Sequence, residues 1–113
     1  MTTSKGMPTN TAKVFKVVAK AAEAQKLITY KEVGVETGLH WRQVPGRLYA
    51  IWQWCEAQHP SLPHLNAIVV NSITRRPGSG YTPNGEPLRE ADFQTMKNRV
   101  FGFDWKSVQF PGT

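Results

Sequence analysis

The chain has 113 residues, a length typical of one folded domain, and its fourteen Lys and Arg residues outnumber eight Asp and Glu to give a net charge of +6. A hydrophobic content of 40%, with four tryptophans, is enough for one buried core and excludes a disordered tail. No apolar run approaches the roughly 20 residues of a membrane-spanning helix, and residues 1–10 lack the apolar segment of a secretory signal. A single cysteine excludes an internal disulfide, so we expect a cytoplasmic protein.

Positive charge is concentrated in two parts of the sequence. Residues 1–31 contain six lysines against one glutamate, and residues 61–85 contain two adjacent arginines and no acidic residue. Clustered basic charge is typical of proteins that bind polyanions, although it also serves solubility. The distribution therefore favours a nucleic-acid partner without establishing one.

Two helices are predicted in the first third of the chain, after a polar segment at residues 1–9 that we expect to be frayed. Apolar side chains recur at helical spacing over residues 11–26, as Val14, Val17, Val18, Ala21 and Ala22. Thr29 and Glu32 have the spacing of a capping box, so a second helix begins there, and Gly38 is a suitable residue to end it.

A third helix is predicted over residues 44–58. Leu48, Ile51, Trp52 and Cys55 recur at helical spacing, and Pro45 suits only the first turn. Two helices joined by a short turn, followed by a longer helix, are typical of helix-turn-helix domains.

The second half of the chain predicts a strand, a hairpin and one more helix. Residues 67–71 form a β-branched run, and residues 73–81 are expected to form a hairpin or loop with an Arg-Arg-Pro-Gly tip. A last helix is expected over residues 88–100, opened by Pro87, and the aromatic tail at 101–110 should fold back on the core. The predicted fold is α+β: a winged helix-turn-helix-like three-helix core with a short β-hairpin and an added C-terminal helix, in a single domain spanning residues 1–113.

Several short motifs occur in the order found in one known family. Residues 29–33 (TYKEV), 42–46 (RQVPG), 62–64 (LPH), 69–72 (VVNS) and 80–81 (GY) follow one another after an amphipathic helix. Over residues 11–81 this series resembles the C-terminal DNA-binding half of the alkylguanine-DNA alkyltransferases and the alkyltransferase-like proteins. The resemblance implies a winged helix that docks its third helix in the minor groove, flips a base, and fills the gap with an arginine.

The acceptor cysteine of that family has no counterpart here. His64 follows Pro63 where the family has its reactive cysteine, and Cys55 lies on the apolar stripe of a predicted helix. Because alkyl transfer requires an activated thiolate, we expect no such activity. The resemblance then implies a non-catalytic protein that senses distorted or modified duplex DNA.

Ten residues are candidates for DNA contacts, either by their charge or by their match to the family. The guanidinium of either Arg42 or Arg47 could replace a flipped base, and Arg42 is favoured because it precedes the third helix. The set is Lys13, Lys16, Lys20, Tyr30, Trp41, Arg42, Arg47, His64, Arg75 and Arg76. Each also has a structural interpretation, as a solvated helix face, a surface ion pair or a packed ring.

Two other functions remain open from the sequence. A small basic protein-binding or inhibitory module, such as an accessory or mobile-element protein, would use Trp41 and the aromatic residues 101–105. A hydrolase or nuclease would use His64 and Asp104, but no catalytic motif supports it. We expect no cofactor, no metal and no small-molecule substrate, because the three histidines have no ligand spacing.

Overall fold

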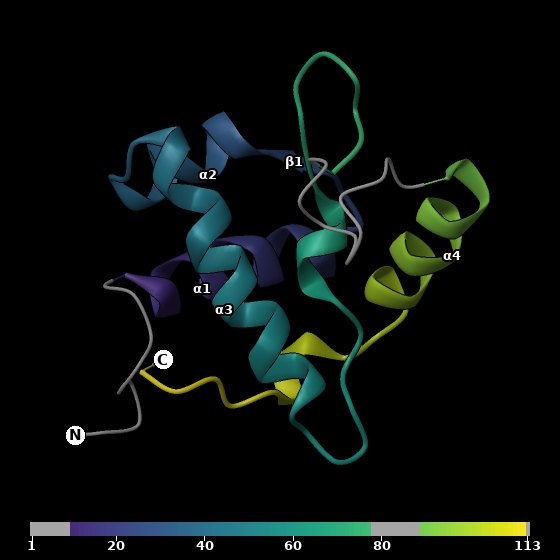
Figure 1. Ribbon diagram of the computed structural model, residues 1–113. Helices are drawn as coiled ribbons and strands as arrows, with labels where there is room; N and C mark the ends of the chain where they lie inside the picture. The colour runs from purple at the N-terminus through teal and green to yellow at the C-terminus, as the bar shows by residue number, and fades with distance from the viewer. Residues whose placement is uncertain (1–9, 78–88, 113) are drawn as a thin grey trace.

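Helices dominate the computed structural model, which describes residues 10–77 and 89–112 (Figure 1). In chain order its elements are α1 (Thr11–Glu23), β1 (Ile28–Thr29), α2 (Tyr30–Thr37), α3 (Val44–Glu56), β2 (Val69–Val70) and α4 (Glu90–Phe101). Three short 3-10 helices accompany them, namely η1 (Trp41–Gln43), η2 (Leu65–Ile68) and η4 (Trp105–Ser107). The described part of the chain is thus a mostly helical domain with four α-helices and a very small sheet.

Local signals in the sequence place the first three helices correctly. The Thr29 hydroxyl accepts a hydrogen bond from the Glu32 backbone N–H at 3.0 Å, and the Glu32 carboxylate accepts one from the Thr29 N–H at 2.8 Å. This capping box opens α2, and Gly38, with φ of 78°, ends it. Pro45 lies in the first turn of α3. The predicted helices are confirmed, except that α1 and α3 end two or three residues earlier than expected.

The predicted β-hairpin is wrong within the described residues. Strand β2 pairs in parallel with β1, so that Ile28 lies opposite Val69 and Thr29 opposite Val70. After β2, the Asn71 side-chain oxygen accepts hydrogen bonds from the N–H groups of Ile73 (2.8 Å) and Thr74 (3.2 Å). These N–H groups are then unavailable to a returning strand, which is why residues 71–77 form a loop. The expected turn at 78–81 and the helix start at 87–88 lie outside the described residues, as does the segment 1–9.

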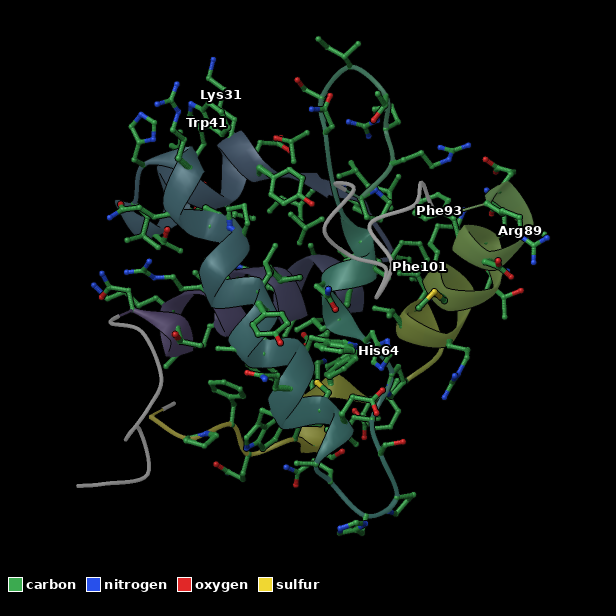
Figure 2. All side chains as sticks on the ribbon, viewed as in Figure 1. Lys31, Trp41, His64, Arg89, Phe93 and Phe101 are labelled. Carbon is green, nitrogen blue, oxygen red and sulfur yellow. The ribbon has the colours of Figure 1, made fainter. Side chains whose placement is uncertain are left out.

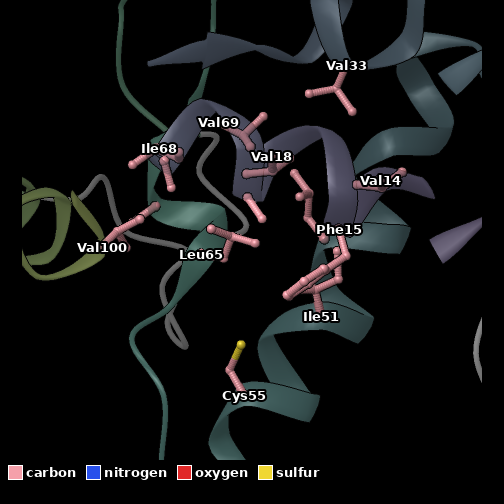
Figure 3. Packing of buried hydrophobic residues seen from close by; sticks show 14 of the residues in the cluster. Val14, Phe15, Val18, Val33, Ile51, Cys55, Leu65, Ile68, Val69 and Val100 are labelled. Atoms are coloured by element: carbon pink, nitrogen blue, oxygen red, sulfur yellow. The ribbon is translucent and has the colours of Figure 1, made fainter. Parts of the chain in front are cut away.

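Helices α1 and α3, the 3-10 helix η2 and the C-terminal segment enclose one hydrophobic core (Figure 3). Apolar side chains of the core are fully buried, including Val14, Val18, Val33, Ile51, Cys55, Leu65, Ile68, Val69 and Val100. Val17 and Ala21, expected on the buried stripe of α1, are only partly buried at its margin. Trp52, also expected in the core, is likewise only partly buried.

The aromatic tail folds back on the core, as expected. Phe110 stacks on Phe15 with ring centroids 4.4 Å apart, and the Trp105 indole N–H donates to the Val100 carbonyl at 2.8 Å. Trp105 is buried, and Phe101 and Phe103 are partly buried. Trp105 therefore has almost no surface to offer a partner, while Phe101 and Phe103 stay partly exposed, so a binding role for residues 101–105 stays a prediction.

The domain has a Cα radius of gyration of 13.0 Å. A compact chain of this length is expected to have about 13 Å. No helix in the described ranges is long and apolar enough to cross a membrane.

Candidate nucleic-acid interface

The parallel pairing of β1 and β2 brings two distant parts of the chain to one edge of the sheet. Both strands run the same way, so the residues that follow Thr29 and Val70 leave the sheet side by side. Tyr30 begins α2 at this edge, and Asn71 begins the loop 71–77. In Figure 1 this loop projects at the same end of the molecule as α2.

A tight turn between α2 and α3 adds a third segment at this end. The backbone of residues 39–41 lies directly on Gly34 of α2, where a Cβ would come within 2.7 Å of the Leu39 carbonyl oxygen. The His40 N–H donates to the Gln43 side-chain oxygen at 3.0 Å, and the Arg42 N–H donates to His40 Nδ1 at 3.1 Å. The turn is thus held by its own side chains, which sets the direction of the residues it displays.

The turn displays an aromatic ring and a guanidinium together. Trp41 is 50% exposed, and the Arg42 guanidinium carbon lies 5.3 Å from the centroid of its indole ring. Such a cation–π contact orients the guanidinium without neutralising its charge. In Figure 2 Trp41 and Lys31 are both drawn at the same end of the molecule.

We call five exposed side chains of these segments the sheet-edge surface. It consists of Lys31, Trp41, Arg42, Ile73 and Arg75, and the same helix α2 also carries the exposed acidic residues Glu32 and Glu36. Three of the five side chains carry positive charge, and two are large apolar groups that are exposed to solvent. Cations can contact phosphates, and an exposed indole can stack on a base.

The two adjacent arginines of the loop have different environments. Arg75 is exposed, and its backbone has a φ of 59°. The Arg76 guanidinium donates to Glu90 at the start of α4 and lies 4.7 Å from the centroid of the Phe93 ring. Hydrogen bonds from Gln94 and Arg76 lower the pKa of the Glu90 carboxyl. Arg76 therefore braces the loop against α4, whereas Arg75 faces solvent.

Tyr30 and Arg47 take part in the packing of the domain as well as lying near its surface. Tyr30 is partly buried against the hydrophobic core at the first position of α2. Arg47 is partly buried, and its guanidinium donates to the Gln43 carbonyl at 3.3 Å, one turn earlier in the chain. Of the two arginines considered for base replacement, Arg42 is thus the more exposed.

The three lysines of α1 form a separate strip. Lys13, Lys16 and Lys20 are exposed, while the intervening Val14 and Val18 are buried. Helix α1 crosses the middle of the molecule in Figure 1, and none of the residues of the sheet-edge surface belongs to it.

His64 lies elsewhere, to the right of the lower part of α3 in the view of Figure 2, and contacts two side chains of that helix. Its Nδ1 accepts a hydrogen bond from the Trp52 indole N–H at 3.2 Å, and its Nε2 contacts the Glu56 carboxylate. Because an indole N–H can only donate, Nε2 carries the proton in this arrangement. The structure does not bring His64 together with Trp41 and Arg42.

The thiol of Cys55 is buried in the core between α3 and η2 (Figure 3). Burial raises its pKa to about 11, partly offset by a hydrogen bond with the backbone of Leu65. A thiol with such a pKa is almost entirely protonated at neutral pH and is a poor nucleophile.

Two residues of the sheet-edge surface were missed by sequence reasoning. Lys31 belongs to the TYKEV motif, but only the sheet register shows that the helix carrying it begins at the same edge of the sheet as the loop. Ile73 is a single aliphatic residue among polar residues in the segment NSITRR, and this isolation was the signal that could have identified it. Its side chain is 88% exposed.

Comparison with known proteins gives no match: no family model, no curated protein and no solved structure matches this chain. Within the described residues, no three His, Cys, Asp or Glu side chains are grouped as metal ligands.

Proposed function

We propose that this protein binds double-stranded DNA without catalysing a reaction, and that it does so through the sheet-edge surface. The observation that carries the proposal is the Trp41–Arg42 pair, a half-exposed indole with a guanidinium over its ring on a turn held by hydrogen bonds. Fixed aromatic and guanidinium groups stack on bases and bond to base edges or phosphates. The net charge of +6 supplies the general attraction to DNA.

The assignment of the domain as a winged helix-turn-helix is part of this proposal. In it, α2 and α3 act as a helix-turn-helix, with α3 entering a groove, and the loop 71–77 stands where a winged helix has its wing. Gly46 supports this orientation, because a Cβ at this position would meet nothing within 4 Å. A glycine with open space around it lets a ligand backbone approach the first turn of α3.

The resemblance to the alkyltransferase-like proteins extends the proposal to distorted or modified duplex. Arg42 is then the residue that occupies the place of a displaced base. The buried, protonated Cys55 supports a non-catalytic protein, because alkyl transfer requires an accessible thiolate.

The test measures duplex binding by fluorescence anisotropy over a range of salt concentrations. If Lys31 and Arg75 each contact one phosphate, the logarithm of the binding constant falls with the logarithm of salt concentration at a slope of roughly −2 or steeper. The Lys31→Ala and Arg75→Ala variants should each reduce the slope by about one, whereas Arg42→Ala should weaken binding through the loss of a base contact. The triple Lys→Ala variant at 13, 16 and 20 is the matched control, since those charges lie off the sheet-edge surface.

A chain that binds no duplex even at low salt would overturn the proposal. That outcome would favour the second candidate, a module that binds another protein. The exposed apolar side chains of Val35, Trp41 and Tyr49 support this candidate.

A further inference from the structure

The loop 71–77 displays an isoleucine whose exposure the packing of the domain does not explain. Ile73 is 88% exposed, whereas both residues of the preceding strand β2 are fully buried. Exposing a β-branched aliphatic side chain gives no stability to the folded chain, because burial of such a group is what stabilises it. The side chain is therefore available for a contact outside the domain.

The loop that carries Ile73 is held in place by several hydrogen bonds. The Asn71 side-chain oxygen accepts from the N–H groups of Ile73 and Thr74, and its backbone N–H donates to the Arg76 carbonyl at 2.9 Å. The Arg75 N–H donates in turn to the Asn71 carbonyl at 2.8 Å. The two ends of the loop are thus tied together, with Ile73 between them.

A side-chain brace fixes the loop relative to the rest of the domain. Arg76 bonds to Glu90 and lies over the Phe93 ring, so α4 supports the base of the loop. Arg75 is not part of this brace in the described contacts and lies exposed two residues from Ile73. An apolar tip on a fixed loop, next to a cation, suits a partner with an apolar interior and an anionic edge.

We propose that Ile73 is a wedge that enters a base step of duplex DNA from the minor groove and bends the duplex. The inference rests on the proposed DNA binding and adds a second contact, distinct from Trp41 and Arg42. Apolar side chains inserted between base pairs unstack them and kink the duplex by about 20–90°. Arg75 contacts a phosphate beside the insertion, and Lys31 lies at the same end of the molecule.

The charge around Ile73 favours DNA over a protein partner. The loop presents one aliphatic side chain rather than an extended apolar patch, and no acidic residue lies within residues 71–77. Wedges are best accepted where stacking is weakest, so flexible pyrimidine–purine steps such as TA are the expected sites.

The experiment measures DNA bending by energy transfer between dyes at the two ends of a short duplex with a central TA step. The parent protein should shorten the end-to-end distance, Ile73→Ala should abolish the shortening, and Ile73→Leu should restore most of it. Val35→Ala is the control, because Val35 is also a highly exposed aliphatic residue (74%) but lies on α2. Since Ile73 makes almost no packing contacts, its variants should keep the parent melting temperature.

The outcomes separate this inference from the proposed function. Salt-dependent binding with no bend, or a bend that survives Ile73→Ala, overturns the wedge and leaves DNA binding intact. Failure of the parent to bind any duplex overturns the proposed function itself. Loss of the bend in Val35→Ala as well would assign the effect to general apolar surface and overturn the role of Ile73.

Discussion

Thr29 of β1 lies opposite Val70 of β2 in a parallel pair, although the two residues are far apart in the sequence. This pairing places the start of α2 and the loop 71–77 at one edge of the sheet. The Thr29 side chain also caps α2, so one residue sets both the strand pairing and the helix start. The sheet-edge surface depends on this relationship, because Lys31 follows Thr29 and Ile73 follows Val70 within a few residues.

Replacing the two loop arginines one at a time should have different effects. Arg75→Ala should reduce the salt dependence of DNA binding by about one unit of slope and leave the melting temperature unchanged, because its side chain faces solvent. Arg76→Ala should lower the melting temperature slightly, because it removes the contacts with Glu90 and Phe93. Salt titrations and thermal unfolding of both variants check this difference, and equal effects of the two on both measurements would contradict it.

Arg42 should act on bases rather than as a general positive charge. Arg42→Lys keeps the charge but loses the planar guanidinium, so it should weaken binding by an amount on the order of 1–3 kcal/mol. The measurement uses duplex containing 2-aminopurine, whose fluorescence rises on unstacking. Arg47→Lys is the control, because Arg47 bonds to the Gln43 carbonyl. If Arg42→Lys binds and unstacks like the parent, Arg42 makes only an ionic contact.

Two glycines should respond in opposite directions to replacement by alanine. Gly34→Ala should destabilise the domain by about 1–3 kcal/mol, because the new Cβ would lie 2.7 Å from the Leu39 carbonyl oxygen and the backbone must shift. Gly46→Ala should stabilise it by about 0.5–1 kcal/mol, because alanine favours the helix and its Cβ meets nothing within 4 Å. Denaturant unfolding measures both changes. If Gly46→Ala is more stable than the parent but binds DNA more weakly, this result would support a close approach of the DNA backbone to the first turn of α3.

Cys55 should be unreactive and should stay unmodified when the protein is incubated with alkylguanine-containing DNA. Its thiol is buried in the core and its pKa is raised to about 11, so little thiolate is present at neutral pH. Mass spectrometry of the intact protein detects any transfer, and an added alkyl group on Cys55 would contradict this prediction.

The raised thiol pKa also predicts how stability depends on pH. The folded protein keeps the Cys55 proton up to about pH 11, while the thiol of the unfolded chain loses it near its ordinary pKa of 9.0. Stability should therefore fall as pH rises from about 9 to 11, by an amount on the order of 2–3 kcal/mol. Cys55→Ala lacks this group, so the difference between the two unfolding curves isolates the effect. Parallel curves across this pH range would show that the thiol does not titrate with unfolding.

Short-range signals in the sequence were sufficient for the helices. The capping box at Thr29 and Glu32, the left-handed Gly38 and the first-turn Pro45 act within one turn of the chain. Their geometry follows from the hydrogen bonds and φ preferences of residues a few positions apart, so they can be recognised without a tertiary structure. The inward-facing aromatic tail was also predictable, because large rings require burial.

Long-range contacts decided which segments of the chain meet at the candidate site. The run at residues 67–71 predicted a strand but not its partner: only residues 69–70 form a strand, which pairs in parallel with β1, while residues 67–68 belong to the 3-10 helix η2. Arg75 and Arg76 are identical in the sequence, and only the position of Glu90 on α4 separates a solvent-facing arginine from a brace. The position of His64 likewise depends on its tertiary contacts with Trp52 and Glu56. Such pairings depend on which elements meet in space, and local propensity carries no information about that choice.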